Sequence, residues 1–398
     1  MPGRAEGGVS KNHTLDPASP FILFRDDKAQ REILFAEPSQ IILAEHPADF
    51  EDAFAAVQSA HDRGKWLAGY LSYEAGFLLE PKLKPLLPAN RRVPLLCFGV
   101  FDGPSDFFLP DRIRLPQDEP ILKAPRAAWN FEEYEKRFSR LHRHLREGDC
   151  YQGNLTFPVH TRWSGDPLAA FDALTSRQPV KYGALAKLGG PIILSRSPEL
   201  FFDVDADGWI ETHPMKGTTP RGLTPEEDDR LRDFLINDPK SQAENRMIVD
   251  LLRNDISLIS KPETLDVPEL FKVERYPTVH QMISRVRAHL NPGLALREIF
   301  AALFPCGSIT GAPKIRAMEI LRTLEGVPRD IYCGSIGWIA PQGRMRFNVA
   351  IRTISLYPDG HATFNIGGGI VFDSTAEAEY EECLLKARFA TGMVPLTN

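Results

Sequence analysis

A lysine in the middle of the sequence is the residue best suited to covalent chemistry. Lys216 lies in the segment HPMKGTTPRG (213–222), between a methionine and a glycine and close to two prolines. Prolines restrict the backbone and burial lowers the pKa of an ammonium group, so a lysine held here can act as a nucleophile. A loop lysine is more commonly a solvated surface charge, because lysine is rarely buried without a partner. The neighbouring motifs have to decide between these two interpretations.

A glutamate interrupts the apolar face of a helix predicted over residues 242–253. On the helical wheel Glu244 lies among Met247, Ile248 and Leu251, where a helix normally contacts the core. A carboxylate on this face is typical either of a structural ion pair or of a ligand for a cation or substrate. The spacing leaves both interpretations open.

A second predicted helix, over residues 376–387, carries Glu379, Glu382, Cys383 and Lys386 on one face. Two carboxylates three residues apart can share a hard cation, and Mg²⁺ typically binds one or two carboxylates together with water and an anionic substrate. The same spacing also allows an exposed ion pair between Glu382 and Lys386. This helix is a candidate metal site, with a surface ion pair as the alternative.

Two glycine-containing segments are suited to binding an anion. The glycine triplet at 367–369 follows a predicted strand, where it lets backbone amides approach a ligand, although a bulge or close strand packing also needs glycine. The segment PCGSITGAPK (305–314) precedes a helix that is expected to end near residue 326. There Ser308 and Thr310 can join free helix amides in binding a carboxylate or phosphate, or one of them can simply cap the helix.

One histidine is a candidate for acid–base chemistry. His280 lies in the strand-like segment YPTVHQM (276–282) and is a candidate catalytic residue. An isolated histidine in such a place is more often a hydrogen-bonded structural residue than a base. Its sequence context leaves both roles open.

Composition excludes several classes of protein. The 398 residues are 43% hydrophobic and 25% charged, with a net charge of −6, which is typical of a globular protein and offers no basic surface for nucleic acid. Five widely spaced cysteines without a CxxC pair argue against a disulfide framework or a zinc site. The sequence has neither a signal-peptide pattern nor a membrane-length apolar run. We therefore expect a cytoplasmic protein with reduced thiols.

The elements that must position these residues predict an α+β fold. Short turns between successive strands favour antiparallel pairing, because parallel strands need longer crossover connections. We expect strands over 66–73, 192–195, 200–204, 332–339, 346–355 and 361–366, and helices over 48–63 and 131–147 in addition to those above. Residues 1–18 have the composition of a flexible tail, and residues 116–120 that of a linker.

Together, and in this order, the motifs resemble the chorismate-utilising enzymes, and within them the synthases that aminate chorismate at C4. The match is dense from about residue 130 to 390 and looser in the N-terminal third, where it rests chiefly on GYLSYEAG (69–76). The motifs that carry it are GDCYQGNLT (148–156), SPELF (197–201), the Lys216 segment, AEN (243–245), DLLRND (250–255), GSITGAPK (307–314), AIRT (350–353), the glycine triplet and EYEE (379–382). Gly153 and Met215 depart from the bulkier residues expected at their positions.

The resemblance implies a fold, a cofactor and a set of substrate contacts. The fold is one of layered antiparallel β-sheets in a sandwich-like core with flanking helices. The cofactor is Mg²⁺, held by Glu244, Glu379 and Glu382 against the ring carboxylate of chorismate. The implied substrate contacts are Gly217, Thr218, Ser308, Thr310, Tyr332, Arg352, Gly367, Gly368, Gly369 and Lys386, with Arg352 as a planar fork for the pyruvyl carboxylate.

The resemblance also assigns a reaction to Lys216. Its amine adds at C2 while the C4 hydroxyl leaves, and ammonia then attacks C4 and expels the lysine, giving 4-amino-4-deoxychorismate for the folate branch. Glu199 would be the general acid, a task that needs a raised pKa, although pairing with Lys216 or Arg196 is an alternative for it. Anthranilate or isochorismate synthesis is a second interpretation, which the lysine disfavours, and a catalytically silent chorismate-binding protein is a third.

The resemblance finally implies a partner and a division of the chain. Ammonia is expected from a separate glutamine amidotransferase subunit, since the sequence shows no fused amidotransferase. The expected division is a flexible tail (1–18), an N-terminal subdomain (19–125) and a chorismate-binding catalytic region (126–398) that shares a core with it. Neither nucleic acid nor membrane is an expected partner.

Overall fold

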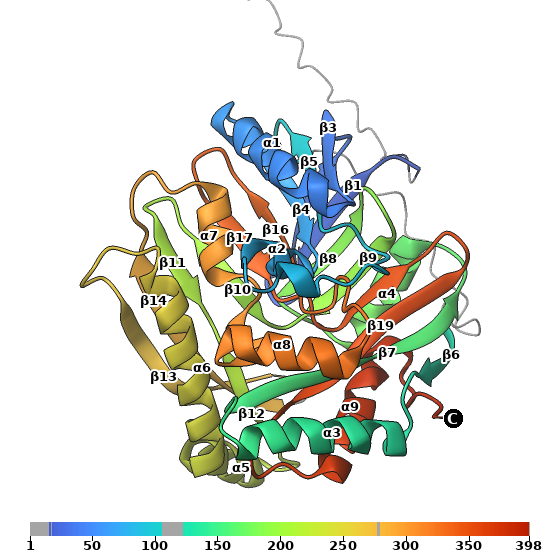
Figure 1. Cartoon of the computed structure of the whole chain (residues 1–398), viewed down its shortest axis with the longest axis vertical. Coiled ribbons are helices and arrows are strands. Elements are labelled where there is room, and N and C mark those ends of the chain that lie inside the picture. Colours follow the sequence, from blue (N-terminus) through green and yellow to red (C-terminus); the bar gives the residue numbers. More distant parts are fainter. Residues whose placement is uncertain (1–15, 17, 106–121, 277–278, 398) are drawn as a thin grey trace, which may run out of the picture.

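Two antiparallel sheets pack face to face, and helices cover the outer face of each (Figure 1). The computed structural model describes residues 16, 18–105, 122–276 and 279–397. The predicted α+β fold with a sandwich-like core and flanking helices is confirmed. Nearly all of the predicted tail (1–18) and the predicted linker (116–120) lie outside the described residues, and the division at residue 125 stays a prediction.

The first sheet carries the glycine triplet. Its strands are, in order, β15 (Gly311–Ala312), β7 (Gln152–Trp163), β19 (His361–Ile370), β18 (Thr353–Leu356), β9 (Ile192–Ser197), β8 (Tyr182–Lys187), β1 (Phe21–Asp26) and β2 (Arg31–Ala36), with β6 (Leu122–Ala127) also beside β7. Four helices form a core with its outer face: α3 (Phe131–Arg146), α4 (Pro167–Arg177), α8 (Lys314–Glu325) and α9 (Ala376–Thr391).

The second sheet carries Lys216 at its edge. Its strands are, in order, β12 (Met215–Pro220), β14 (Val279–His289), β11 (Trp209–Thr212), β10 (Leu200–Val204), β17 (Met345–Asn348), β16 (Ser335–Ile339), β4 (Trp66–Leu71), β5 (Leu96–Phe101) and β3 (Gln40–Ala44), with β13 (Asp266–Arg275) also beside β14. Its core is shared with α1 (Phe50–Asp62), α2 (Ala75–Leu79), α6 (Pro239–Ser257) and α7 (Leu296–Leu303), while α5 (Pro225–Asn237) packs on β12. No helix in the described ranges is long and apolar enough to cross a membrane.

The chain passes from one sheet to the other at two places that matter for the site. The predicted strand over 346–355 is wrong as a single strand, because β17 belongs to the second sheet and β18 to the first. Arg352 lies at this crossing with a φ of +52°. The second crossing, between β9 and β10, contains Glu199. Alternation of apolar residues cannot reveal such a crossing, since both halves are buried strands.

The helices around the site begin and end at residues that stabilise helix termini. Asn130 accepts a hydrogen bond from the Glu133 amide at the start of α3, and Thr375 caps α9 in the same way. Helix α8 ends at Gly326, whose φ of +73° suits glycine, as the sequence predicts. These local signals explain why the predicted helices over 131–147, 242–253 and 376–387 are all confirmed.

Candidate active site

The backbone around Lys216 is held from two sides. Strand β12 pairs with β14 through an irregular register between Met215 and Thr218, and Gly217 has a φ of +86°. A β-carbon at Gly217 would lie 2.8 Å from Ser241 Cβ on α6, so only glycine fits. On the other side Gln281 Nε2 donates to the Gly217 carbonyl at 2.8 Å and its Oε1 accepts from Thr218 Oγ1 at 2.9 Å. The lysine therefore projects from a fixed, irregular part of β12, residues 215–218, which we call the Lys216 turn.

The Lys216 amine reaches across to the first sheet. A β-carbon placed on Gly369 would lie 3.2 Å from Lys216 Nζ, so the glycine triplet leaves the space that the amine enters. Removal from water lowers the pKa of Lys216, and Lys386 lowers it further, against the charges of Glu244 and other carboxylates nearby. This shift increases the fraction of neutral amine, which is the nucleophilic form.

Glu199 is a buried carboxyl group beside this amine. It is 6% exposed, and Ser308 Oγ donates to its Oε1 at 2.6 Å. Burial raises the pKa of Glu199 to about 7, although the Ser308 hydrogen bond and the Lys216 charge both oppose the rise. A carboxyl group with such a pKa carries a proton near neutral pH and can protonate a leaving group.

The turn that contains Ser308 orients Glu199. Ser308 lies in the single 3₁₀ turn Gly307–Ile309, and its hydroxyl is used by Glu199. Thr310 donates within the turn, to the carbonyls of Cys306 at 3.3 Å and Gly307 at 3.2 Å. Both hydroxyls predicted to bind substrate thus donate to groups of the protein itself.

Arg352 supplies a positive charge without a protein partner. Among the described residues its guanidinium makes neither a hydrogen bond nor an ion pair, while removal from water lowers its pKa to about 10 despite the nearby Tyr332. Arg352 is half-buried, so its guanidinium can meet a ligand that enters the site and forms the missing pair. The planar fork of Arg352, presented by a strained backbone, is suited to a carboxylate ligand.

A cavity adjoins Tyr332 on the inner face of the first sheet. Its volume is about 170 Å³, and its walls include Arg92, His160, Asp330, Tyr332 and Asn365. Of the predicted site residues Tyr332 alone is among those that line it, so this cavity is separate from the space around Lys216.

The three predicted metal ligands come from two helices, and two of them, Glu244 and Glu382, act electrostatically on the Lys216 amine. Glu244 projects from α6, and Glu379 and Glu382 from α9; all of them act electrostatically on the lysine or on one another. Burial raises the pKa of Glu379, and the Glu382 charge adds to this shift. Lys386 pairs with Glu382 at 2.7 Å and donates to the Gly367 carbonyl at 3.0 Å.

The carboxylates fit a divalent cation in their chemistry. A β-carbon at Gly368 would lie 2.9 Å from Glu379 Oε2, so glycine there makes the room that this carboxylate occupies, and Ser374 Oγ holds its other oxygen at 2.7 Å. Carboxylates that repel one another are the ligands Mg²⁺ prefers. In the described part of the chain, however, Glu244, Glu379 and Glu382 do not bring one oxygen each within 4.8 Å of the others.

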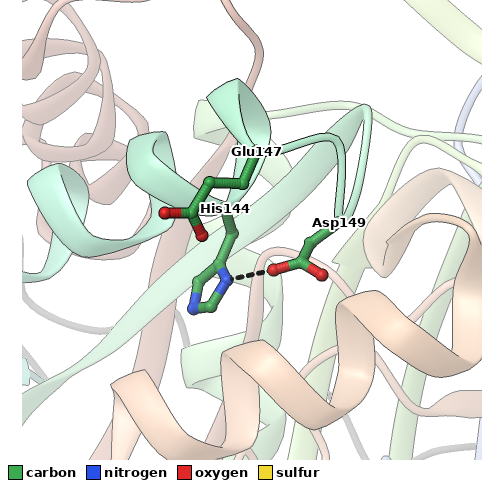
Figure 2. A group of neighbouring side chains, drawn as sticks. All are labelled: His144, Glu147 and Asp149. Carbon is green, nitrogen blue, oxygen red and sulfur yellow. Dashed lines mark hydrogen bonds and ion pairs between the residues drawn. The ribbon is translucent and has the colours of Figure 1, made fainter.

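One triad in the described ranges does meet that distance, but it lies at the end of α3 (Figure 2). His144 Nδ1 bonds Asp149 Oδ2 at 2.6 Å, and Arg316 donates to the other oxygen of Asp149 at 3.1 Å. Glu147 completes the triad and is exposed. Because both oxygens of Asp149 are already paired, this group is an ion-pair cluster at a helix end.

His280 is held away from the amine by a different partner. It is fully buried, and its Nε2 bonds Asp228 Oδ1 on α5 at 2.8 Å. Asp228 also forms a two-point ion pair with Arg221. No described hydrogen bond or ion pair joins His280 to Lys216 or Glu199, so its catalytic role stays a prediction.

The structure adds residues that sequence reasoning did not single out. The side chain of Gln281, next to His280 on β14, bonds the Lys216 turn, whereas that of His280 bonds Asp228. Gln152 Nε2 would lie 3.0 Å from a β-carbon on Gly369 and therefore borders the same space as the Lys216 amine. Alternation along β14 was the available signal for Gln281, because adjacent strand residues point to opposite faces. The glycine at position 153, where a bulkier residue was expected, is explained by Leu141 on α3, because a β-carbon at 153 would lie 2.9 Å from the Leu141 side chain.

Comparison with known proteins agrees with this geometry. The chorismate binding enzyme family matches residues 108–392. Aminodeoxychorismate synthase component 1 of Klebsiella aerogenes is 44% identical over 262 residues, which are 66% of this chain and 58% of that protein. Anthranilate synthase component 1 of Methanothermobacter thermautotrophicus is 36% identical over 338 residues, 81% of this chain and 72% of that protein. The chain spans just over half the length of the aminodeoxychorismate synthase components that it matches.

Solved structures share the fold over nearly the whole chain. Anthranilate synthase component I from Streptococcus pneumoniae has a TM-score of 0.76 at 25% identity and covers 98% of this chain and 95% of its own. The menaquinone-specific isochorismate synthase of Escherichia coli has a TM-score of 0.73 at 18% identity, with 98% and 93% covered. The resemblance predicted from the motifs is confirmed, and the chain belongs to the family of chorismate binding enzymes.

Proposed function

We propose that this protein aminates chorismate at C4 to give 4-amino-4-deoxychorismate. The observation that carries the proposal is the Lys216 amine, whose pKa is lowered and which lies against Gly369, together with the buried Glu199, whose pKa is raised to about 7. The relatives at 43–44% identity that bear the name aminodeoxychorismate synthase component 1 support it. Ammonia would come from a separate glutamine amidotransferase subunit, in keeping with the word component in those names.

The first step forms a bond to the enzyme. Neutral Lys216 Nζ adds to C2, the ring double bonds shift from C1–C2 and C5–C6 to C1–C6 and C4–C5, and the C4 hydroxyl leaves. Glu199 donates its proton to that hydroxyl, so water departs and a carboxylate remains. The adduct nitrogen keeps its extra proton.

The second step reverses the shift. Ammonia attacks C4, the double bonds return, and the Lys216 amine leaves C2 in its neutral form. The new C4 ammonium returns a proton to the Glu199 carboxylate, which restores the acid. The net change is the replacement of the C4 hydroxyl by an amino group, with water as the second product.

The other site residues bind and orient the substrate. The unpaired fork of Arg352 would hold the pyruvyl carboxylate, with Tyr332 beside it. Glu244, Glu379 and Glu382 would hold Mg²⁺, which when bound neutralises the ring carboxylate and their mutual repulsion. Holding the ring at both ends leaves C2 in front of the amine, where proximity lowers the barrier.

Product analysis tests the proposal. Purified protein incubated with chorismate, Mg²⁺ and ammonium should form 4-amino-4-deoxychorismate, and Lys216→Ala should lose that product at least about 100-fold while still binding chorismate. Lys272→Ala, which removes an exposed lysine paired with Glu269, is the matched control and should keep full activity. Without ammonia, intact mass should show the chain carrying chorismate minus water.

Two results would count against the proposal. Anthranilate as the main product would favour a second candidate function, anthranilate synthesis, which the relatives named anthranilate synthase component 1 suggest. An undiminished rate in Lys216→Ala would remove the lysine from the mechanism.

A further inference from the structure

One side chain at the centre of the site has a polar group without a partner. Gln152 begins β7 and is 1% exposed, and its Nε2 makes no hydrogen bond to any described residue. Leaving a buried donor unpaired costs about 1–3 kcal/mol, so native structures seldom do so without a reason. The free donor therefore indicates that its partner is absent from the protein itself.

The neighbours of Gln152 on the same face of β7 are satisfied. Side chains two residues apart on a strand share a face, which places Asn154 and Thr156 beside it. Asn154 Nδ2 lies 4.0 Å from Cys333 Sγ, and Thr156 Oγ1 donates to a carboxylate at 3.1 Å. Of these three residues of β7, only Gln152 thus has an unpaired side-chain donor.

Gln152 is also fixed in place. Its backbone pairs with Ala312 of β15, and a β-carbon on Gly311 would lie 2.2 Å from the Gln152 carbonyl oxygen, so the two chains touch closely. A β-carbon on Gly369 would lie 3.0 Å from Gln152 Nε2 and 3.2 Å from Lys216 Nζ. Both nitrogens therefore border the same small space above Gly369.

We propose that Gln152 is a further substrate-binding residue, whose Nε2 donates to an oxygen of chorismate next to the carbon that Lys216 attacks. The identity of this substrate rests on the proposed function. Both ring carbons beside C2 carry oxygen, as the carboxylate at C1 and the enol ether at C3. Nε2 binds one of these oxygens when the ring lies on Gly369.

An uncharged donor suits this position better than a charged one. A carboxylate beside Lys216 would raise the pKa of the amine and repel the dianionic substrate. A cation would attract the Glu199 carboxylate that must later accept a proton. The amide of Gln152 fixes the ring and leaves both neighbouring charges as they are.

Substitution of Gln152 should separate binding from folding. Gln152→Met keeps an unbranched chain of similar length without the donor, and should weaken the Kd for chorismate with Mg²⁺ about tenfold or more by calorimetry. Without ligand its urea midpoint should be unchanged or higher, because the unpaired buried donor is gone. Gln152→Glu should weaken the Kd further than Gln152→Met.

A second glutamine provides the control. Gln58 on α1 uses both ends of its amide, donating to Asp62 at 2.8 Å and accepting from the Leu296 amide at 2.8 Å. Gln58→Met should therefore lower the urea midpoint and leave the chorismate Kd unchanged. A purely structural Gln152 would behave in the same way as Gln58, and that outcome overturns the inference.

Product analysis on the same samples separates the two proposals. Wild-type protein that binds chorismate but forms no 4-amino-4-deoxychorismate refutes the proposed function, while a weakened Kd in Gln152→Met still supports this inference. Normal product from the wild type together with an unchanged Kd in Gln152→Met refutes this inference alone.

Discussion

Two ionisable groups of the candidate site, Lys216 and Glu199, have pKa values shifted in opposite directions. Burial lowers the pKa of Lys216 and raises that of Glu199 to about 7, because each loses the water that stabilises its charged form. Both shifts increase the share of molecules that have a neutral amine together with a protonated acid. This is the protonation state that addition at C2 with loss of a hydroxyl requires.

The pKa of Glu199 predicts how adduct formation depends on pH. Single-turnover formation of the Lys216 adduct, followed by intact mass without ammonia, needs both the neutral amine and the protonated Glu199. The neutral amine becomes more abundant as pH rises, whereas the protonated acid is lost above about pH 7, so a plot of the logarithm of the rate constant against pH should bend downward near pH 7. Glu199→Gln should lower this rate constant by about 100-fold or more and remove the bend. A wild-type profile without a bend between about pH 6 and 8.5 would exclude Glu199 as the acid.

At the scale of elements, β19 and α9 together shape the predicted metal site. Strand β19 runs antiparallel to β7, and its three glycines leave room for Lys216 at Gly369 and for Glu379 at Gly368. Helix α9 begins at Ala376, after the capping residue Thr375, and brings Glu379 and Glu382 to that strand within its first two turns. Side chains on β19 would occupy the space that the carboxylate and the amine now fill.

Gly368→Ala tests this arrangement. The added β-carbon would lie 2.9 Å from Glu379 Oε2 and displace that carboxylate, so we expect the Mg²⁺ concentration for half-maximal activity to rise about tenfold or more. Gly103→Ala is the control, because the nearest atom to its β-carbon, Trp66 Nε1, is 4.0 Å away. An unchanged Mg²⁺ requirement in Gly368→Ala would show that Glu379 does not hold the metal.

At the scale of the whole molecule, a buried polar cluster joins the two halves of the sequence. Arg329 is 2% exposed; it pairs with Glu325, and its backbone amide donates to Glu74 Oε1 at 2.7 Å. Its guanidinium also donates to the carbonyls of Ile309 at 3.0 Å and Asn154 at 2.7 Å. The cluster thereby connects α2, α8, β7 and the turn that orients Glu199.

This cluster predicts a pH-dependent stability. Burial, together with the charge of Asp330, raises the pKa of Glu74 to about 8, far above its value in an unfolded chain. The folded state then holds a proton that the unfolded state releases, so Glu74 destabilises the fold progressively as pH rises from about 4.5 to about 8. Glu74→Gln should remove this loss and be more stable than wild type at pH 8 by at least about 1 kcal/mol, but not at pH 5.

Urea unfolding at several pH values, followed by circular dichroism, checks this expectation. Glu135→Gln, which alters an exposed glutamate on α3, should show no such dependence relative to wild type. A difference between Glu74→Gln and wild type that stays constant from pH 5 to 8 would show that Glu74 is ionised in the folded state.

The sequence by itself determined the chemical groups and the local elements. Capping residues and periodic apolar faces predicted α3, α6 and α9, and the ordered motifs predicted the family, because helix signals and motifs are carried by residues close together in the chain. Only the tertiary structure decided that Lys216 meets Gly369 across two sheets, that Gln281 and not His280 contacts the Lys216 turn, and that Gln152 keeps a free donor. Burial, pKa shifts and unpaired donors depend on neighbours that lie far away in sequence, so no local pattern encodes them.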